Sequence, residues 1–398
     1  MRRPEGTGTG ARGGPRVALV TNVMAHYRVP CFERLAAQLP GRITFFLLAE
    51  EMEHRRYVLA AGGAGGGIGA SESLPVSVLR ERRRWRRPPF DDVHWNDVRP
   101  VTRGAYDVLI LSSWSEPTFL LLWLRHLMRR TRVLFWCEST ARDFPRRWAR
   151  EAVKRLLLRA AAGCIVPGRR SGEYCRQLGV PEERLFVAPN ATDRDFFRRR
   201  AERLAPRRGT VRRELHLDGL SLLFVGRLVE SLKGVAVLLR AVAALESRGL
   251  AVTLSLAGDG PDRRRYQALA AELGCRDVRF LGILDHEALC LHYAAADVLV
   301  LPSRSEPWGF VLNEGMEFGL PLVVSDAVGA GPDLVRPGEN GYRVPAGDVP
   351  ELAAALNRLA GDRALRRGMG HASRALIVDY SPESWARGVL RAIRAVAG

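Results

Sequence analysis

The sequence predicts an α/β protein of two domains, each built on a parallel β-sheet that is covered by helices. The chain has 398 residues, which exceeds the size of one average domain. Apolar residues make up 47% of it, which is enough for two cores. Short apolar runs alternate with helix-length amphipathic stretches, first in one half and then in the other. Strands that alternate with helices indicate parallel sheets with both faces covered.

The first half contains seven expected strands and an amphipathic helix at 29–39. The strands are expected at 16–21, 43–48, 74–79, 107–112, 132–137, 163–166 and 185–188. Residues 60–70 are nearly all Gly and Ala, which predicts a loop. Residues 198–215 are rich in Arg and contain Pro206, so they are expected to bridge the two domains.

The second half repeats the pattern more tightly. Strands are expected at 221–225, 252–256, 278–281, 298–301 and 322–324. One helix is expected at 235–247, and another follows the turn at 258–261 and runs through residue 273. The predicted first domain is therefore residues 16–197, the linker is 198–215 and the second domain is 216–378. Residues 1–15 are expected to be a loose tail without a signal-peptide core, and residues 379–398 a closing helix. Ligands bind at the carboxyl ends of the strands in such sheets.

The formal charge of +18 comes almost wholly from arginine, since Lys154 and Lys233 are the only lysines. Such a surface attracts nucleotides, phospholipid head groups or nucleic acid. The densest cluster, Arg-Glu-Arg-Arg-Arg-Trp-Arg-Arg at 80–87, is either a membrane-surface or anionic-acceptor patch or a solvated loop. No apolar run approaches the length of a membrane span. Cysteines without Cys-x2-Cys pairs and histidines without ligand spacing predict free thiols in a reducing cytosol and no metal site.

The most informative motif is the pair Glu306 and Glu314, which follows an apolar strand-like run. A helix is expected to open around Pro307 and to stop at Gly319. Glu306 then lies in the loop and Glu314 about 10 Å along the helix axis, with free N–H groups between them. This arrangement can hold a sugar, a phosphate and a ribose together. An ordinary acidic helix start is the alternative, and a glycosidase acid–base pair fits less well because this spacing does not impose converging carboxylates.

Cationic and glycine-rich strand ends accompany this motif. Gly226 and Arg227 follow one strand, and Lys233 opens the next helix. An arginine forks onto two phosphate oxygens and a lysine adds a compact charge, although a solvated helix start would look the same. The turn at 258–260 (Gly-Asp-Gly) allows close backbone approach to a ligand and is by itself weak evidence.

Polar side chains also follow strands of the first half. They are candidate acceptor or phosphate contacts, with loop and helix capping as the alternative: Asn22, His26, Tyr27, Arg28, Glu138 and Asn190.

These motifs, in this order, resemble glycosyltransferase family 4, a group of retaining, nucleotide-sugar-dependent enzymes with the GT-B fold. The resemblance covers most of residues 180–350 and is looser in the first half, where it rests on 27–30 and 189–190. Three features depart from the family. The first loop lacks the usual Gly-Gly pair, residues 136–138 stand where many members carry a histidine, and Asp333 stands where a glutamate is common.

The resemblance implies two Rossmann-like domains with parallel sheets facing across a cleft. The first would bind the acceptor, the second would bind the nucleotide sugar, and helix 379–398 would cross back to the first. Arg227 and Lys233 would hold the donor diphosphate, Glu306 the donor sugar and Glu314 the ribose. Backbone and loop contacts to the phosphates and the base would come from Gly226, Gly258, Asp259, Gly260, Leu284, Gly309, Phe310 and Val311.

The expected function is transfer of a sugar from a nucleotide diphosphate donor to an acceptor hydroxyl with retention of configuration. The acceptor would be a glycan, a lipid-linked molecule or a small molecule. No metal, cofactor or nucleic-acid partner is expected, and the location would be cytoplasmic, with peripheral contact to an anionic inner membrane face as a further option. A sugar-nucleotide epimerase or hydrolase of the same fold is the first alternative, and a non-catalytic binder of polyanions or membranes is the second.

Overall fold

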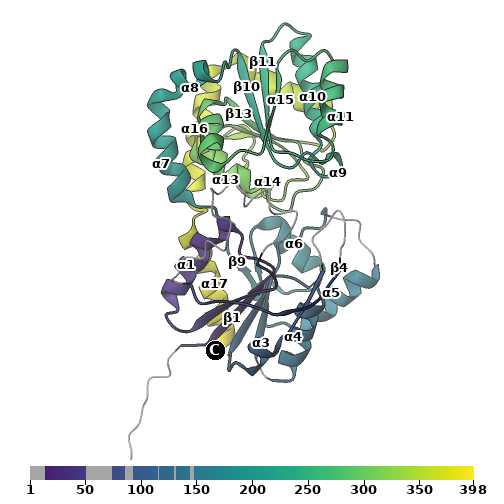
Figure 1. Cartoon of the computed structure of the whole chain (residues 1–398), viewed down its shortest axis with the longest axis vertical. Coiled ribbons are helices and arrows are strands. Elements are labelled where there is room, and N and C mark those ends of the chain that lie inside the picture. The colour runs from purple at the N-terminus through teal and green to yellow at the C-terminus, as the bar shows by residue number, and fades with distance from the viewer. Residues whose placement is uncertain (1–13, 51–73, 86–92, 115, 130, 144–147) are drawn as a thin grey trace, which may run out of the picture.

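The protein folds into two α/β domains joined by two chain crossings (Figure 1). The computed structural model describes residues 14–50, 74–85, 93–114, 116–129, 131–143 and 148–398. The glycine-rich loop expected at 60–70, most of the tail and residues 86–87 of the basic cluster lie outside the described residues.

The first domain is built on a seven-stranded sheet in which every pair of neighbouring strands is parallel. Its order is β3 (Val76–Val78), β2 (Ile43–Leu47), β1 (Val17–Thr21), β6 (Val108–Leu111), β7 (Arg132–Trp136), β8 (Gly163–Val166) and β9 (Leu185–Val187). Alternate residues of β1 enter different cores, Val17 and Leu19 on one face and Ala18 and Val20 on the other. Both faces of the sheet are therefore covered, as the apolar strands predict.

Helices cover the two faces of this sheet. Figure 1 shows α1 and α17 on one side and α3, α4 and α5 on the other. The bounds are α1 (Val29–Gln38), α3 (Arg99–Arg103), α4 (Pro117–Leu127), α5 (Trp148–Ala160), α6 (Arg169–Gln177) and α17 (Pro382–Ala397), with a 3-10 turn η1 at His26–Arg28.

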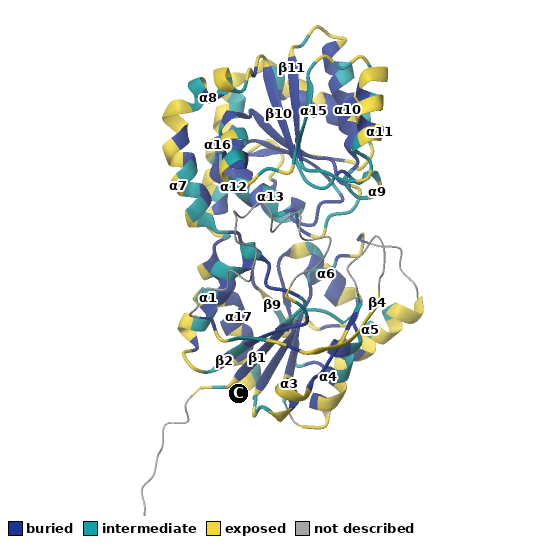
Figure 2. Cartoon of the chain, viewed as in Figure 1, coloured by how far each residue is buried: buried dark blue, intermediate teal, exposed yellow. Residues whose placement is uncertain are grey.

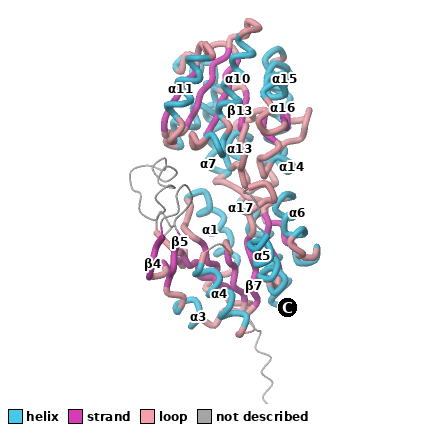
Figure 3. Tube along the Cα trace, turned by 90° about the vertical axis from the view of Figure 1, so that its right-hand side faces the viewer, coloured by secondary structure: helices cyan, strands magenta, loops and turns pink. Residues whose placement is uncertain are grey.

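A two-stranded antiparallel hairpin, β4 (Glu81–Trp85) with β5 (Val93–Asn96), was not expected from the sequence. It lies at one side of the first domain (Figure 3) and includes part of the basic cluster. All five residues of β4 are exposed, so the sequence has no apolar alternation that would indicate a strand. The rings of Trp85 and Trp95 lie 6.3 Å apart on it.

The second domain is built on a six-stranded parallel sheet. Its order is β12 (Val278–Gly282), β11 (Val252–Ala257), β10 (Leu220–Val225), β13 (Val298–Leu301), β14 (Leu322–Ser325) and β15 (Gly341–Val344). The first five agree with the predicted strands to within a residue, whereas β15 was missed. Figure 2 shows the strands buried and the outer sides of the flanking helices exposed.

The helices of this domain lie on both faces of the sheet (Figure 1). They are α7 (Arg194–Leu204), α8 (Arg208–Glu214), α9 (Glu230–Lys233), α10 (Val235–Glu246), α11 (Arg263–Glu272), α12 (His286–Ala295), α13 (Phe310–Glu317), α14 (Gly331–Leu334), α15 (Val349–Gly361) and α16 (Arg363–Ile377).

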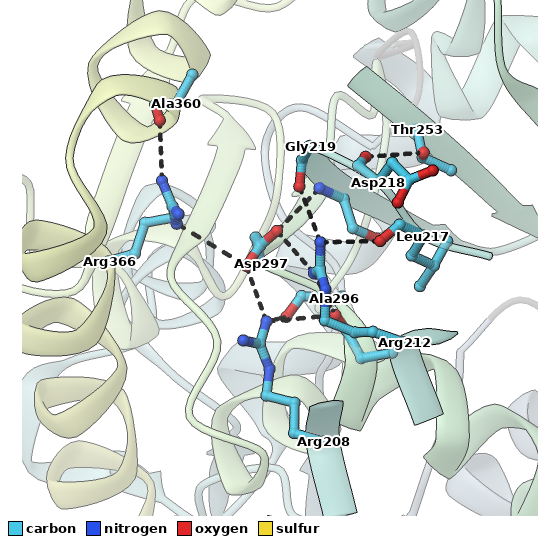
Figure 4. Close-up of polar contacts among 12 residues, drawn as sticks. Arg208, Arg212, Leu217, Asp218, Gly219, Thr253, Ala296, Asp297, Ala360 and Arg366 are labelled. Carbon is cyan, nitrogen blue, oxygen red and sulfur yellow. Dashed lines mark hydrogen bonds and ion pairs between the residues drawn. The ribbon is translucent and has the colours of Figure 1, made fainter. Parts of the chain in front are cut away.

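Residues 198–215, expected to bridge the domains, are instead helical and part of the second domain. Ala201, Leu204 and Val211 are buried in its core. Arg208 and Arg212 both pair with the buried carboxylate of Asp297 at the start of β13, at 2.8 and 2.9 Å (Figure 4). The arginines that suggested a solvated bridge therefore attach α8 to the sheet, because their charged ends find one buried carboxylate and neighbouring carbonyls.

The closing helix α17 packs on the first domain, against α1, β8 and β9. Its Trp385 is fully buried there, 5.3 Å from the ring of Trp136 and 5.7 Å from that of Phe32. Among the described residues, no helix combines the length and the apolar character needed to cross a membrane.

Candidate functional site

The candidate site lies at the carboxyl ends of β10 and β13, which are neighbours at the centre of the second sheet. The chain leaves β10 towards β11 and returns to β13 on the other side, so the loops after these two strands diverge. Such a switch point is where open α/β sheets bind ligands. The two loops are held together by the backbone, since the N–H groups of Arg304 and Ser305 donate to the carbonyl of Leu232 at 2.8 and 3.0 Å.

Lys233 and Glu306 meet in this place and form an ion pair. The side chains of Lys233 and Glu306 are 18% and 15% exposed, so the pair is largely removed from water but a ligand can still reach it. The Lys233 chain passes beside Gly226, where an added Cβ would lie 3.5 Å from the lysine Cε. The ammonium has three N–H donors, so it can keep Glu306 and still donate to a phosphate group that reaches the pair.

Arg227 follows Gly226 directly and is half-buried. Within the ranges that the structure describes, no carboxylate pairs with its guanidinium. The group is therefore available to an anionic ligand, as its position after the strand predicts.

The helix after Glu306 begins later than the sequence predicts. Pro307 is not in the first turn; α13 begins at Phe310, and Gly309 precedes it with φ of 99°. Glu306 is instead held in a bridge with Val328, so the chain needs a left-handed residue before it can enter the helix. No side chain caps the first turn. The backbone N–H groups of Phe310 and Val311 thus lie at a helix N-terminus that can receive an anion.

Glu314 lies on α13, half-buried, and accepts a hydrogen bond of 2.7 Å from the hydroxyl of Tyr293. Burial raises the pKa of Glu314 to about 7, and the hydrogen bond from Tyr293 only partly offsets this effect. A second polar partner that donates to this carboxylate would favour its charged form.

The glycine turns of the site are in mutual contact. The N–H of Gly258 donates to the carbonyl of Gly282 at 2.7 Å, and an added Cβ on Gly258 would lie 2.0 Å from the carbonyl oxygen of Gly226. Gly260 approaches the carbonyl of Leu228 in the same way. Asp259 accepts a hydrogen bond from the N–H of Gly260. Leu284 is half-buried and packs against the hydrophobic core of the second domain. These turns bring the ends of β10, β11 and β12 together.

The candidates from the first domain divide into three groups. Arg28 donates to Oδ1 of Asn190 at 2.8 Å, pairs with Glu138 and lies 4.5 Å above the ring of Trp136. The side chains of Arg28, Asn190 and Glu138 therefore bind one another in this structure. The amide Nδ2 of Asn190 is buried and has no hydrogen-bond partner in the described structure.

His26 and Tyr27 reach across to the second domain. The ring of Tyr27 lies 4.4 Å from that of Phe310, and the ring of His26 lies 4.8 Å from that of His286. Burial, with a smaller contribution from His286, lowers the pKa of His26 to about 4. Asn22 is placed elsewhere, since its amide donates to Glu116 at 2.6 Å.

Sequence patterns did not reveal three residues that support this site. Tyr293 holds Glu314, and Trp308 donates to Asn313 at 2.9 Å. Asn313 in turn donates to the backbone carbonyl of Asn190 at 3.0 Å, which joins the two domains. An apolar helix position and a polar residue beside a motif carry no separate signal. Among the described residues, no group of three or more His, Cys, Asp and Glu side chains could hold a metal ion.

Two family models match the chain, one in each domain. The model for glycosyl transferases group 1 matches residues 219–362, and that for the glycosyl transferase 4-like domain matches residues 30–191. The first includes every residue of the candidate site in the second domain.

Curated relatives match over most of the chain. An alpha-D-kanosaminyltransferase from Streptomyces kanamyceticus is 32% identical over 73% of this chain and 74% of its own length. A D-inositol 3-phosphate glycosyltransferase from Streptomyces scabiei is 34% identical over 92% of this chain and 83% of its own.

Solved structures share the whole architecture at low identity. HepE from Anabaena, in complex with UDP and glucose, matches with a TM-score of 0.70 and 19% identity over 95% of this chain and 98% of its own. A sucrose-phosphate synthase from Thermosynechococcus elongatus matches with a TM-score of 0.69 and 22% identity over 96% and 98% of the two chains.

Proposed function

Because the chain belongs to the group 1 glycosyltransferases, we propose that it moves a sugar from a nucleotide diphosphate donor to an acceptor hydroxyl with retention of configuration. The GT-B fold expected from the sequence is confirmed by the solved structures. The observation that carries the donor proposal is the Lys233–Glu306 pair beside the open N-terminus of α13.

Negative charge grows on the leaving diphosphate as the glycosidic bond breaks. Lys233, Arg227 and the N–H groups of Phe310 and Val311 are the groups that stabilise it. An ammonium has three N–H donors, so Lys233 can keep Glu306 and still bind a phosphate oxygen. This charge stabilisation by fixed groups requires no metal ion.

Glu306 and Glu314 hold the two ends of the donor. Glu306 receives hydroxyl groups of the sugar, and Glu314 receives those of the ribose through the oxygen that Tyr293 leaves free. The leaving diphosphate takes the acceptor proton on the same face, so no separate base is required. Crystals of HepE contain UDP or UDP-glucose, which makes UDP-sugars the first donors to test.

The acceptor is assigned to the first domain, as a glycan, a lipid-linked molecule or a small molecule. The exposed hairpin, with Arg83 and Arg84 on β4 and exposed rings of Trp85 and Trp95, is the surface that would contact an anionic membrane face in the cytoplasm.

Thermal denaturation with a panel of nucleotide sugars tests the donor proposal. A ligand that binds the folded state at 100 times its Kd adds about 2.7 kcal/mol to the free energy of unfolding. We expect one donor and its nucleoside diphosphate to raise the melting temperature of the wild type and to lose this effect in Lys233→Ala. No shift with any nucleotide sugar would refute the proposal.

An epimerase or hydrolase would use the same phosphate contacts. It would consume the donor without an acceptor, at a rate that acceptors do not increase. A donor-only assay followed by addition of candidate acceptors therefore separates it from a transferase.

A further inference from the structure

A cationic pocket of about 410 Å³ lies between the domains and contains no residue of the donor site. The first domain contributes the loop after β7 and one side of α6, and the second contributes α14 and β15. Its lining residues are Thr140, Ala141, Arg142, Arg169, Arg170, Glu173, Tyr174, Gln177, Pro332 and Arg343.

The pocket has an excess of positive charge. Four arginines line it, and Glu173 is its one acidic lining residue. Arg142 is compensated by Asp326 at 2.7 Å. Among the described residues, no carboxylate forms an ion pair with the guanidinium groups of Arg169, Arg170 or Arg343, although Asp326 and Glu173 are near enough to favour the charged form of Arg170. The proximity of the three arginines is therefore unfavourable unless an anion joins them.

Arg170 shows this most clearly. Its Nη1 is buried and has no hydrogen-bond acceptor within the described residues. Burial, with a contribution from Arg142, lowers the pKa of Arg170 from its ordinary value. An unpaired N–H of a charged group is destabilising when it is hidden from water. The high arginine content of the chain explains exposed arginines but not a half-buried one whose hidden Nη1 lacks an acceptor among the described residues.

The nearby carboxylate of Asp333 binds the backbone beside these arginines and forms no ion pair with their guanidinium groups among the described residues. It accepts from the backbone N–H of Arg169 at 3.1 and 3.2 Å. Burial raises the pKa of Asp333 to about 6, so its carboxylate is itself poorly stabilised.

We propose that this pocket is a binding site for the phosphate group of a small soluble anion, separate from the donor diphosphate site. Guanidinium groups bind phosphate oxygens in pairs, and three of them from two domains match a dianion. The pocket volume leaves room for a small organic group attached to the phosphate.

Such a ligand would join the domains beside the loop between β13 and α13, residues 302–309, which we call the donor loop. Arg169 and Arg170 belong to the first domain and Arg343 to the second. The segment before α14 is bonded to the donor loop, since the N–H groups of Gly329 and Ala330 donate to the carbonyls of Glu306 and Trp308 at 2.7 and 3.1 Å. An anion in the pocket would therefore favour the arrangement of the two domains that the structure shows.

The experiment is calorimetric titration of the full chain with inorganic phosphate, in two sets of variants. Lys233→Ala removes the donor site and leaves the pocket intact. Arg170→Gln with Arg343→Gln removes two pocket charges and leaves the donor site intact, and Arg170→Lys with Arg343→Lys is the charge-preserving control. Circular dichroism and cooperative thermal unfolding show that each variant is folded.

We expect phosphate to bind Lys233→Ala as it binds the wild type, and to bind the double glutamine variant about tenfold more weakly or less. The double lysine variant should retain most of the affinity. Absence of phosphate binding, or binding that Lys233→Ala abolishes and the glutamine variant keeps, would overturn the proposal. Binding to vesicles of phosphatidic acid but not to free phosphate would equally overturn it. None of these results depends on whether the protein transfers a sugar.

Discussion

The ammonium of Lys233 is the residue-scale feature with the most direct consequence for catalysis. It is largely buried and lies at the carboxylate that would hold the donor sugar. One preorganised hydrogen-bond donor to a developing anion lowers the activation barrier by about 2.7–4 kcal/mol. We therefore expect Lys233→Ala or Arg227→Ala to lower kcat at least about a hundredfold in steady-state assays with the identified donor.

The matched control is Arg248→Ala, since Arg248 is exposed and lies between the end of α10 and the amino end of β11, whereas the site lies at the carboxyl ends of the strands. Its kcat should remain within about twofold of the wild type because surface substitutions of this kind are nearly neutral. Near-wild-type turnover in both Lys233→Ala and Arg227→Ala would contradict the assigned role.

Glu314 should make donor binding depend on pH. Its pKa is raised from 4.5 to about 7 by burial, so the folded protein holds this proton more tightly than the unfolded chain. The stability that the protonated form provides is present below the ordinary pKa and is lost as the pH rises through about 7. Ribose hydroxyls donate to the charged carboxylate, and binding should therefore strengthen over the same interval.

The measurement is the Kd of the nucleoside diphosphate for the wild type and for Glu314→Gln. Between about pH 6 and about pH 8, the wild-type Kd should fall about tenfold more than that of the variant. Ionisation of the ligand affects both proteins equally and cancels in this comparison. Parallel curves for the two proteins would exclude Glu314 as the titrating group.

At the scale of elements, α17 makes the end of the chain a structural part of the first domain. Its Trp385 is fully buried against Trp136 and Phe32. Trp385→Ala removes a large side chain from a packed core, which costs about 3–5 kcal/mol of unfolding free energy. Urea denaturation should show this loss.

The control for that variant is Val378→Ala just before α17. Val378 is 49% exposed, and its substitution should change stability by less than about 0.5 kcal/mol. An equally small loss for Trp385→Ala would mean that the helix is not attached as the structure shows.

At the scale of the whole molecule, individual contacts join the domains near the donor loop and can be removed one at a time. The tilted rings of Tyr27 and Phe310 are in contact, Asn313 donates to the Asn190 carbonyl, and Ser305 donates to the Asp143 carbonyl at 2.8 Å. An aromatic pair contributes about 0.5–1.5 kcal/mol beyond its buried area.

Tyr27→Ala should therefore shift the molecule towards more open arrangements. We expect a larger radius of gyration in small-angle scattering and a higher KM for the donor, with the melting temperature little changed. Tyr342→Ala is the control, because Tyr342 is half-buried within the second domain. An unchanged scattering curve for Tyr27→Ala would show that this contact does not hold the domains together.

The two sheets and the order of the motifs follow from the sequence alone. Apolar runs at strand spacing, and residues such as Gly226, Lys233 and Glu306 at their ends, are local signals that any parallel sheet places at one edge. The tertiary structure decided what local signals cannot contain. It placed Asp297 within reach of Arg208 and Arg212, so that α8, in the segment expected to link the domains, is attached to the second domain. It also bonded Arg28 to Asn190 and Glu138, and it brought Arg170 and Arg343 from different domains into one pocket. The physical reason is that a charged side chain is bound or free according to partners distant in sequence, and only the folded chain determines which partners those are.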